Sequence, residues 1–178
     1  MHMVIRAIVF AKSADEALES ATAVFEQLTG DDKPFDYFTT FRTDESSVSG
    51  QRRWGKIPWA VPVASPKGQK LLKDGMDATR HEFMENITEV RKLLAAQTDQ
   101  QLYDSNTWEL WRAKGLTRPA GSDVWVYGPD GDSIANDQDL HAALLGETPA
   151  GWYEVDAPCK RAPKPTRQAY IVPADVHF

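Results

Sequence analysis

The chain has 178 residues, of which 42% are hydrophobic and 26% are charged, as in an ordinary globular protein of one domain. No apolar run approaches the roughly 18 residues that a membrane span needs, and the first residues lack the pattern of a signal peptide. A single cysteine, Cys159, excludes an internal disulfide and a cysteine-based zinc site. The formal net charge of −6 argues against a surface that coats nucleic acid as a whole. We therefore expect a cytoplasmic protein, with no cofactor and no metal.

The first third of the chain predicts a strand, a helix and a second strand. Residues 3–11 (MVIRAIVFA) are apolar on both alternating faces, which is typical of a central strand covered on both sides. A capping box at Ser13–Glu16 opens a helix that ends at Gly30. Residues 35–41 (FDYFTTF) are rich in aromatic and β-branched side chains and predict the second strand.

A long connection and a long helix occupy the middle of the chain. Residues 43–64 carry Ser, Gly and Pro and predict a loop, and loops of this length are often functional. Ser65 and Pro66 form a helix start, and apolar residues then keep one face through residue 96. A second capping box at Thr98–Gln101 predicts a short helix to about Asp104.

The last third predicts short elements separated by loops. Residues 105–121 are irregular, residues 122–127 predict a strand, and residues 128–131 (GPDG) predict a turn. Asn136 caps a helix that Gly146 ends, and residues 151–155 predict a further strand. After a proline-rich loop at 156–167, residues 168–172 predict a strand that extends past Pro173 through 174–178.

This order of elements predicts one α+β domain over residues 1–178. We expect a two-layer sandwich with a mixed or antiparallel sheet and helices on one face. A ferredoxin-like arrangement is the leading topology. Long loops are expected at about 43–64, 105–121 and 156–167.

Half of the positive charge lies in three segments that contain no acidic residue. Residues 46–64 and 111–121 carry three Lys or Arg each, and residues 157–172 carry four, which makes ten of the chain's 20. The first two segments also carry tryptophans, which can stack on a ligand while arginine pairs with its phosphate or carboxylate. The candidate binding residues are Arg52, Arg53, Trp54, Lys56, Trp59, Trp111, Arg112 and Lys114.

A structural interpretation of the same residues stays open. The tryptophans can pack these loops onto the core, and the arginines can pair with acids on the 66–96 helix. Asp77, His81 and Glu85 have a spacing that would allow a metal site, but they lie opposite the apolar stripe, so we interpret them as a solvated face. Neither the histidines nor Cys159 has a partner that would identify a catalytic pair.

No motif in the sequence specifies a reaction, so three hypotheses for the function remain. The first is a module that binds an anionic partner through its basic loops: a nucleotide, a nucleic acid or an acidic protein surface. The second is a homo-oligomer in which the acidic helices of one copy meet the basic loops of another. The third is an enzyme with a site in the cleft between the long loops.

Overall fold

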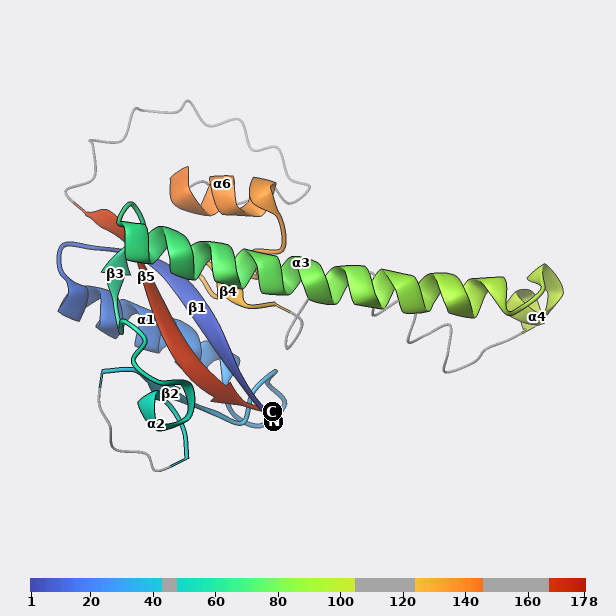
Figure 1. Ribbon diagram of the computed structural model, residues 1–178, viewed down its shortest axis with the longest axis horizontal. Coiled ribbons are helices and arrows are strands. Elements are labelled where there is room, and N and C mark those ends of the chain that lie inside the picture. The colour runs from blue at the N-terminus through green and yellow to red at the C-terminus, as the bar shows by residue number, and fades with distance from the viewer. Residues whose placement is uncertain (43–47, 105–123, 146–166) are drawn as a thin grey trace.

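The computed structural model describes residues 1–42, 48–104, 124–145 and 167–178 (Figure 1). The strands are β1 (His2–Ala11), β2 (Tyr37–Thr40), β3 (Val61–Pro62), β4 (Val126–Tyr127) and β5 (Gln168–His177). The helices are α1 (Ala14–Leu28), α2 (Gln51–Trp54), α3 (Pro66–Ala95), α4 (Asp99–Asp104) and α6 (Asp137–Leu145). None of the helices in these ranges is both long and apolar enough to cross a membrane.

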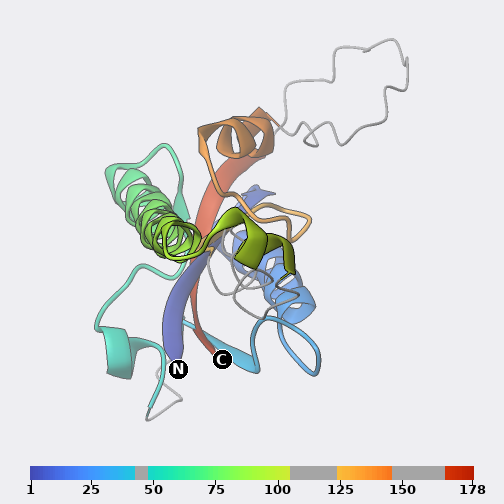
Figure 2. The ribbon, with the colours of Figure 1, turned by 90° about the vertical axis from the view of Figure 1, so that its right-hand side faces the viewer.

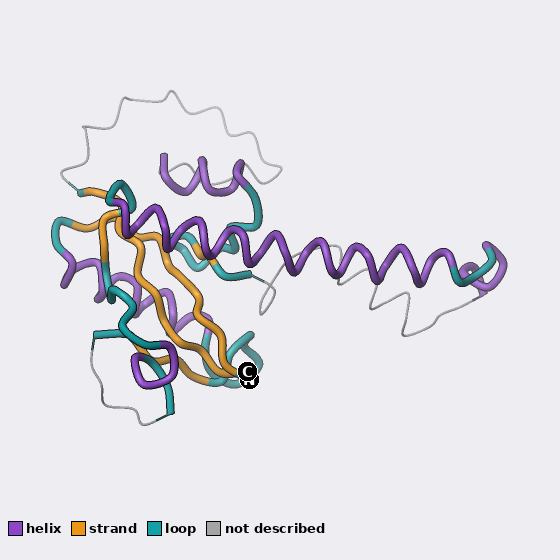
Figure 3. The backbone as a smooth tube through the Cα atoms, in the orientation of Figure 1, coloured by secondary structure: helices purple, strands orange, loops and turns teal. Residues whose placement is uncertain are grey.

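The sheet is built around the pairing of the first strand with the last. β1 and β5 run antiparallel over ten residues, from His2 opposite His177 to Ala11 opposite Gln168. The strand order is β2-β5-β1-β4, and β3 also pairs with β5. β4 runs parallel to β1, whereas β2 and β3 run antiparallel to β5, so the sheet is mixed. The two chain ends therefore lie side by side, as Figures 1 and 3 show.

Helices cover both faces of the sheet. Alternate residues of β1 face opposite sides: Met3, Ile5, Ala7 and Val9 pack with α1, while Ile8 packs with α3 and α6. Figure 2 shows α1 on one side of β1 and β5, and α3 on the other. Both central strands are therefore buried on both faces, which explains why their sequences are almost continuously apolar.

Pro173 lies inside β5, where a proline would normally remove a hydrogen bond of the ladder. The opposite residue, Arg6, donates its backbone N–H to Trp125 on the β4 side, so Arg6 and Pro173 form a non-hydrogen-bonded pair. The Pro173 nitrogen therefore points to the other edge, between the residues that pair with β3 and those that pair with β2. The gap between these two short strands accommodates the proline.

The long helix α3 packs on the sheet through its first half. A Cβ atom at Gly68 would lie 2.1 Å from the carbonyl oxygen of Pro62, and one at Gly75 would lie 2.6 Å from Cγ2 of Val126. These two glycines let the helix approach β3 and β4 closely. The second half of α3 extends away from the sheet, towards α4 (Figure 1).

The structure confirms the predicted α+β class and the mixed sheet. The capping boxes at Ser13 and Thr98 are also present, since each side chain accepts the backbone N–H three residues later. The helices cover both faces, whereas we expected them on one face. Together with the parallel β4, this arrangement departs from the ferredoxin-like topology. The relevant signal was that both alternating faces of β1 are apolar, because a strand buried on both sides needs a covering layer on each side.

Two further differences concern the loops. The connection expected at 43–64 contains α2 and β3 in its described part. The strand expected at 151–155, the loop at 105–121 and nearly all of the loop at 156–167 lie outside the described residues.

The close approach of α3 to β3 leads to a prediction about Gly68. Gly68→Ala is expected to lower the free energy of unfolding by about 2 kcal/mol, because the new methyl group meets backbone atoms of Pro62. Urea denaturation measures this change. Lys67→Ala, at the neighbouring exposed position of the same helix turn, is the control and should change stability by less than about 0.5 kcal/mol. Equal stability of Gly68→Ala and the parent protein would contradict the described helix position.

Candidate functional site

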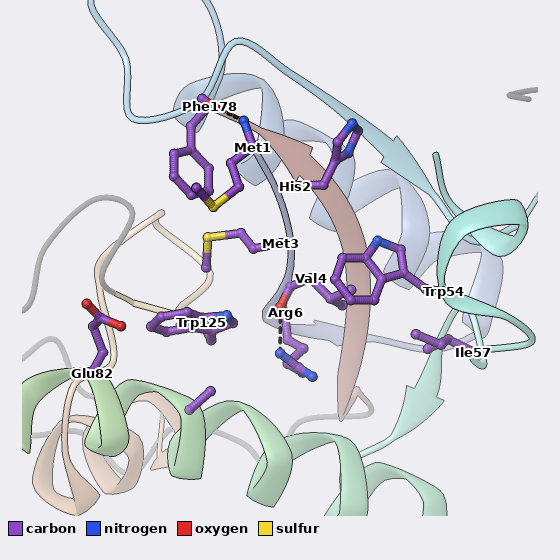
Figure 4. Close-up of a pocket in the computed structure, with 11 residues that line it drawn as sticks. Met1, His2, Met3, Val4, Arg6, Trp54, Ile57, Glu82, Trp125 and Phe178 are labelled. Carbon is purple, nitrogen blue, oxygen red and sulfur yellow. Dashed lines mark hydrogen bonds between the residues drawn. The ribbon is translucent and has the colours of Figure 1, made fainter. Parts of the chain in front are cut away.

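A pocket of about 600 Å³ lies between α3 and the first half of β1 (Figure 4). Its walls come from the two chain ends, β1, α2 with the residues after it, the middle of α3, and the residue before β4. Most of the lining is apolar. The lining residues are Met1, His2, Met3, Val4, Arg6, Trp54, Ile57, Ala78, Glu82, Trp125 and Phe178.

The pocket forms where the sheet becomes narrow. β4 has two residues and pairs with β1 only at Arg6 and Ala7. On that edge, the part of β1 before Arg6 has no neighbouring strand among the described residues. The Val4 carbonyl oxygen, which points to this edge, instead accepts a hydrogen bond of 2.6 Å from Nη1 of Arg6. The space beside this open strand is enclosed by side chains rather than by backbone.

Arg6 is the charged residue at the centre of this arrangement. It comes from the middle of β1 and is 9% exposed. Its side chain lies over Gly75 of α3, where an added Cβ atom would be 2.8 Å from Cδ of Arg6. Among the described residues the guanidinium makes one hydrogen bond, to Val4, and its enclosed Nε has no partner. Since a guanidinium has five N–H donors, the described part of the fold leaves most of them without a protein acceptor.

Burial also changes the acid–base behaviour of Arg6. Removal from water lowers the pKa of Arg6 to about 10, well below its usual range, although the nearby Asp74 carboxylate acts in the opposite direction. Asp74 is itself paired with Lys70, at 2.8 Å. Arg6 still carries its charge at neutral pH, so the folded protein contains a cation that the described residues do not neutralise by direct contact.

Trp54 forms one wall of the pocket and is placed by α2. Gly50, which precedes this helix, donates its backbone N–H to Oδ2 of the fully buried Asp175 in β5, at 2.8 Å. The Gln51 side chain donates to the Phe41 carbonyl oxygen at 2.7 Å. Gly50 has a φ of 60°, in the left-handed region that favours glycine. Asp175 thus attaches the helix that carries Trp54 to the central sheet.

The second oxygen of Asp175 fixes a residue at the rim of the pocket. Nδ1 of His2 lies 3.0 Å from Oδ1 of Asp175, and the His2 ring also contacts the rings of Tyr37 and His177 edge-on. His177 is in turn 2.7 Å from Asp36, at the surface. These contacts connect β1, β5 and β2 at the end of the sheet that holds both termini.

The opposite wall is formed by Trp125 and α3. The backbone N–H of Trp125 donates to Oγ1 of Thr79 at 3.1 Å, and this hydroxyl donates to the Gly75 carbonyl oxygen. Thr79 therefore connects the residue before β4 to the middle of α3. Ala78 and Glu82 of the same helix also line the pocket.

The structure brings one of the residues predicted from the sequence into this site. Trp54 lines the pocket, whereas Arg52, Arg53 and Lys56 are exposed around it on α2 and the following turn. Trp59 is half-buried, and the guanidinium of Arg42 lies 5.2 Å from its ring centroid. The other predicted residues lie outside the described residues: Trp111, Arg112 and Lys114.

The alternative interpretation expects ion pairs between these arginines and α3. Neither Arg52 nor Arg53 forms such a pair within the described ranges. Asp77 pairs with Lys73, and His81 pairs with Glu85 at 3.5 Å, which confirms the solvated helix face. No group of three potential metal ligands occurs in the part of the chain that the structure describes.

Sequence reasoning missed Arg6 and Asp175. Each is a single charged residue inside an otherwise apolar strand, and each strand is buried on both faces. A charge at such a position is costly unless it is paired or functional, and this was the available signal. The apolar residues around Arg6 and Asp175 identify these segments as strands, but they do not indicate which groups the two charges contact.

The pocket and its buried arginine define a small α+β protein with an internal cationic site. The whole chain, residues 1–178, matches a family model described as "Domain of unknown function (DUF7995)", and the chain belongs to this family. No curated protein and no solved structure matches the chain.

The unpaired charge of Arg6 leads to a prediction about stability. Arg6→Met keeps a long unbranched side chain and removes the buried cation, so we expect the free energy of unfolding at pH 7 to rise by about 1 kcal/mol. The gain is limited because Val4 loses its donor. Chemical denaturation of both proteins measures the difference. A loss of about 3 kcal/mol or more would show that the fold itself needs the arginine.

The same substitution gives a pH dependence with a defined sign. The folded-state pKa of Arg6, about 10, lies below the pKa of the same group in the unfolded chain. Above about pH 10 the folded protein therefore releases this proton before the unfolded chain does, and the cost of burial decreases. The advantage of Arg6→Met over the parent should shrink as the pH rises through 10. An advantage that grows over this range would contradict the assignment.

Asp175 should be far more important for stability than an exposed aspartate with a similar partner. Asp175→Asn places an amide N–H group or a weaker acceptor against Gly50 and His2, and should cost about 2 kcal/mol. Asp36→Asn is the matched control, because Asp36 also contacts a histidine but lies at the surface, and it should cost less than about 1 kcal/mol. Thermal unfolding of the two variants separates the cases, and equal losses would contradict the anchoring role.

Proposed function

We propose that the protein binds a small organic anion in the pocket beside β1, with Arg6 as its counter-ion. The observation that carries the proposal is the guanidinium of Arg6, which is buried, charged at neutral pH and bonded to a single described acceptor. A protein gains nothing in stability from such a group, and a carboxylate or phosphate oxygen is the acceptor that a guanidinium best fits.

The apolar lining indicates what the rest of the ligand is like. Trp54, Trp125 and Met3 offer aromatic and thioether surfaces around the cation (Figure 4). The volume of about 600 Å³ lies in the range of about 300–1,000 Å³ that is typical of small-molecule sites. This size favours a small ligand over a nucleic acid or a protein surface. The exposed Arg52, Arg53 and Lys56 around Trp54 would attract an anion to the entrance.

Titration with benzoate, with benzyl alcohol as its uncharged counterpart, tests the proposal. Benzoate should bind at least tenfold more tightly than benzyl alcohol, because only the carboxylate brings a negative charge to Arg6 and can accept two parallel hydrogen bonds from it. Arg6→Met should weaken benzoate binding at least tenfold and leave benzyl alcohol unaffected. Isothermal calorimetry measures both affinities.

Arg53→Met is the control for overall charge, because it removes one exposed arginine from α2. It should weaken benzoate binding less than about threefold, and this effect should disappear at high salt. Benzoate binding that survives Arg6→Met, or that depends equally on Arg53, would reject Arg6 as the counter-ion.

A further inference from the structure

We infer that the ligand is dipolar: its anionic end meets Arg6, and a cationic, hydrogen-bond-donating end meets Glu82 on the opposite side of the same pocket. This inference rests on the proposed function, since it takes Arg6 as the site of the anion. It adds a second recognition group and therefore a narrower class of ligand.

Glu82 differs from the other acidic residues of α3. It is half-buried, it lines the pocket, and it has no hydrogen bond or ion pair with any described residue. Every other acidic residue of this helix has a basic partner three or four positions away on the same helix. These pairs are Lys70–Asp74, Lys73–Asp77, His81–Glu85 and Lys92–Glu89. The one carboxylate without such a partner is thus the one that faces the pocket.

The helix sets the distance between the two charges. Arg6 lies beside Gly75, while Glu82 is seven residues further along α3. Because an α-helix rises by 1.5 Å per residue, the two groups are separated by roughly 10 Å along its axis. Gly75, Ala78 and Glu82 share one helix face, so both charged groups border the same space. An α-amino acid, whose charges are adjacent, is too short to meet both.

The surface between the two charges is apolar. Figure 4 shows Trp125 between Glu82 and Arg6, with Met3 beside it. Ala78 of α3 adds a further apolar side chain to the lining. A methylene chain or a flat ring would cover this surface while its two ends pair with the charged residues. A ligand with negative charge at both ends would instead meet repulsion from the unpaired Glu82 carboxylate. The pocket thus matches a molecule with an anionic end, an apolar middle and a cationic end.

Three probes of matched size test this inference. 6-Aminohexanoate carries its two charges at opposite ends, 2-aminohexanoate carries the same groups on adjacent atoms, and hexanoate lacks the ammonium group. We expect 6-aminohexanoate to bind at least tenfold more tightly than either of the others, as followed by NMR titration. Glu82→Gln, which keeps the shape of the side chain, should reduce this preference to less than threefold without weakening hexanoate binding.

Two controls separate the possible failures. Glu85→Gln removes an exposed carboxylate that is paired with His81, and the preference for 6-aminohexanoate should remain. Binding of hexanoate and 6-aminohexanoate with equal affinity, lost in Arg6→Met, would overturn the role of Glu82 and leave the anion site intact. If none of the probes binds, or if binding persists in Arg6→Met, the proposed function and the dipolar ligand are both rejected.

Discussion

The antiparallel pairing of β1 with β5 is the contact on which the rest of the structure depends. It joins the two ends of the chain over ten residue pairs and places both strands at the centre of the sheet. One face of this pair then receives α1, and the other receives α3 and α6. The two short strands β2 and β3 share the free edge of β5, while β4 covers only part of β1. The pocket is a consequence of this unequal coverage, because it occupies the space beside the uncovered part of β1.

The position of Arg6 connects this architecture with a function. Its side chain lies where β4 begins and where Gly75 lets α3 approach the sheet. The described part of the fold surrounds the guanidinium but leaves most of its donors without an acceptor. Burial disfavours the charged form, and a hydrophobic residue of similar length would fit the same space. A bound anion would supply the negative charge and the hydrogen-bond acceptors that the described residues do not offer to Arg6. Replacing Arg6 with an apolar residue should therefore weaken anion binding and raise the free energy of unfolding.

Much of the local structure could be predicted from the sequence, because it depends on neighbouring residues. The capping box at Ser13, the asparagine cap at Asn136 and the apolar face of the 66–95 helix all act within a few residues. The pairing of β1 with β5 joins residues more than 150 positions apart and has no local signal. For the same reason, Trp54 could be identified as a candidate from its basic loop, whereas its approach to Arg6 depends on Asp175, near the other end of the chain.

The most direct test of the central claim is to observe the Arg6 guanidinium while an anion is added. The side-chain ¹⁵Nε resonance of Arg6, assigned by its absence in Arg6→Met, can be followed by NMR during a benzoate titration. This resonance should shift and reach a plateau, because the carboxylate accepts hydrogen bonds from the guanidinium and changes the surroundings of Nε. If the Arg6 resonance stays constant while those of exposed arginines such as Arg52 and Arg53 move, the buried arginine is not the binding group.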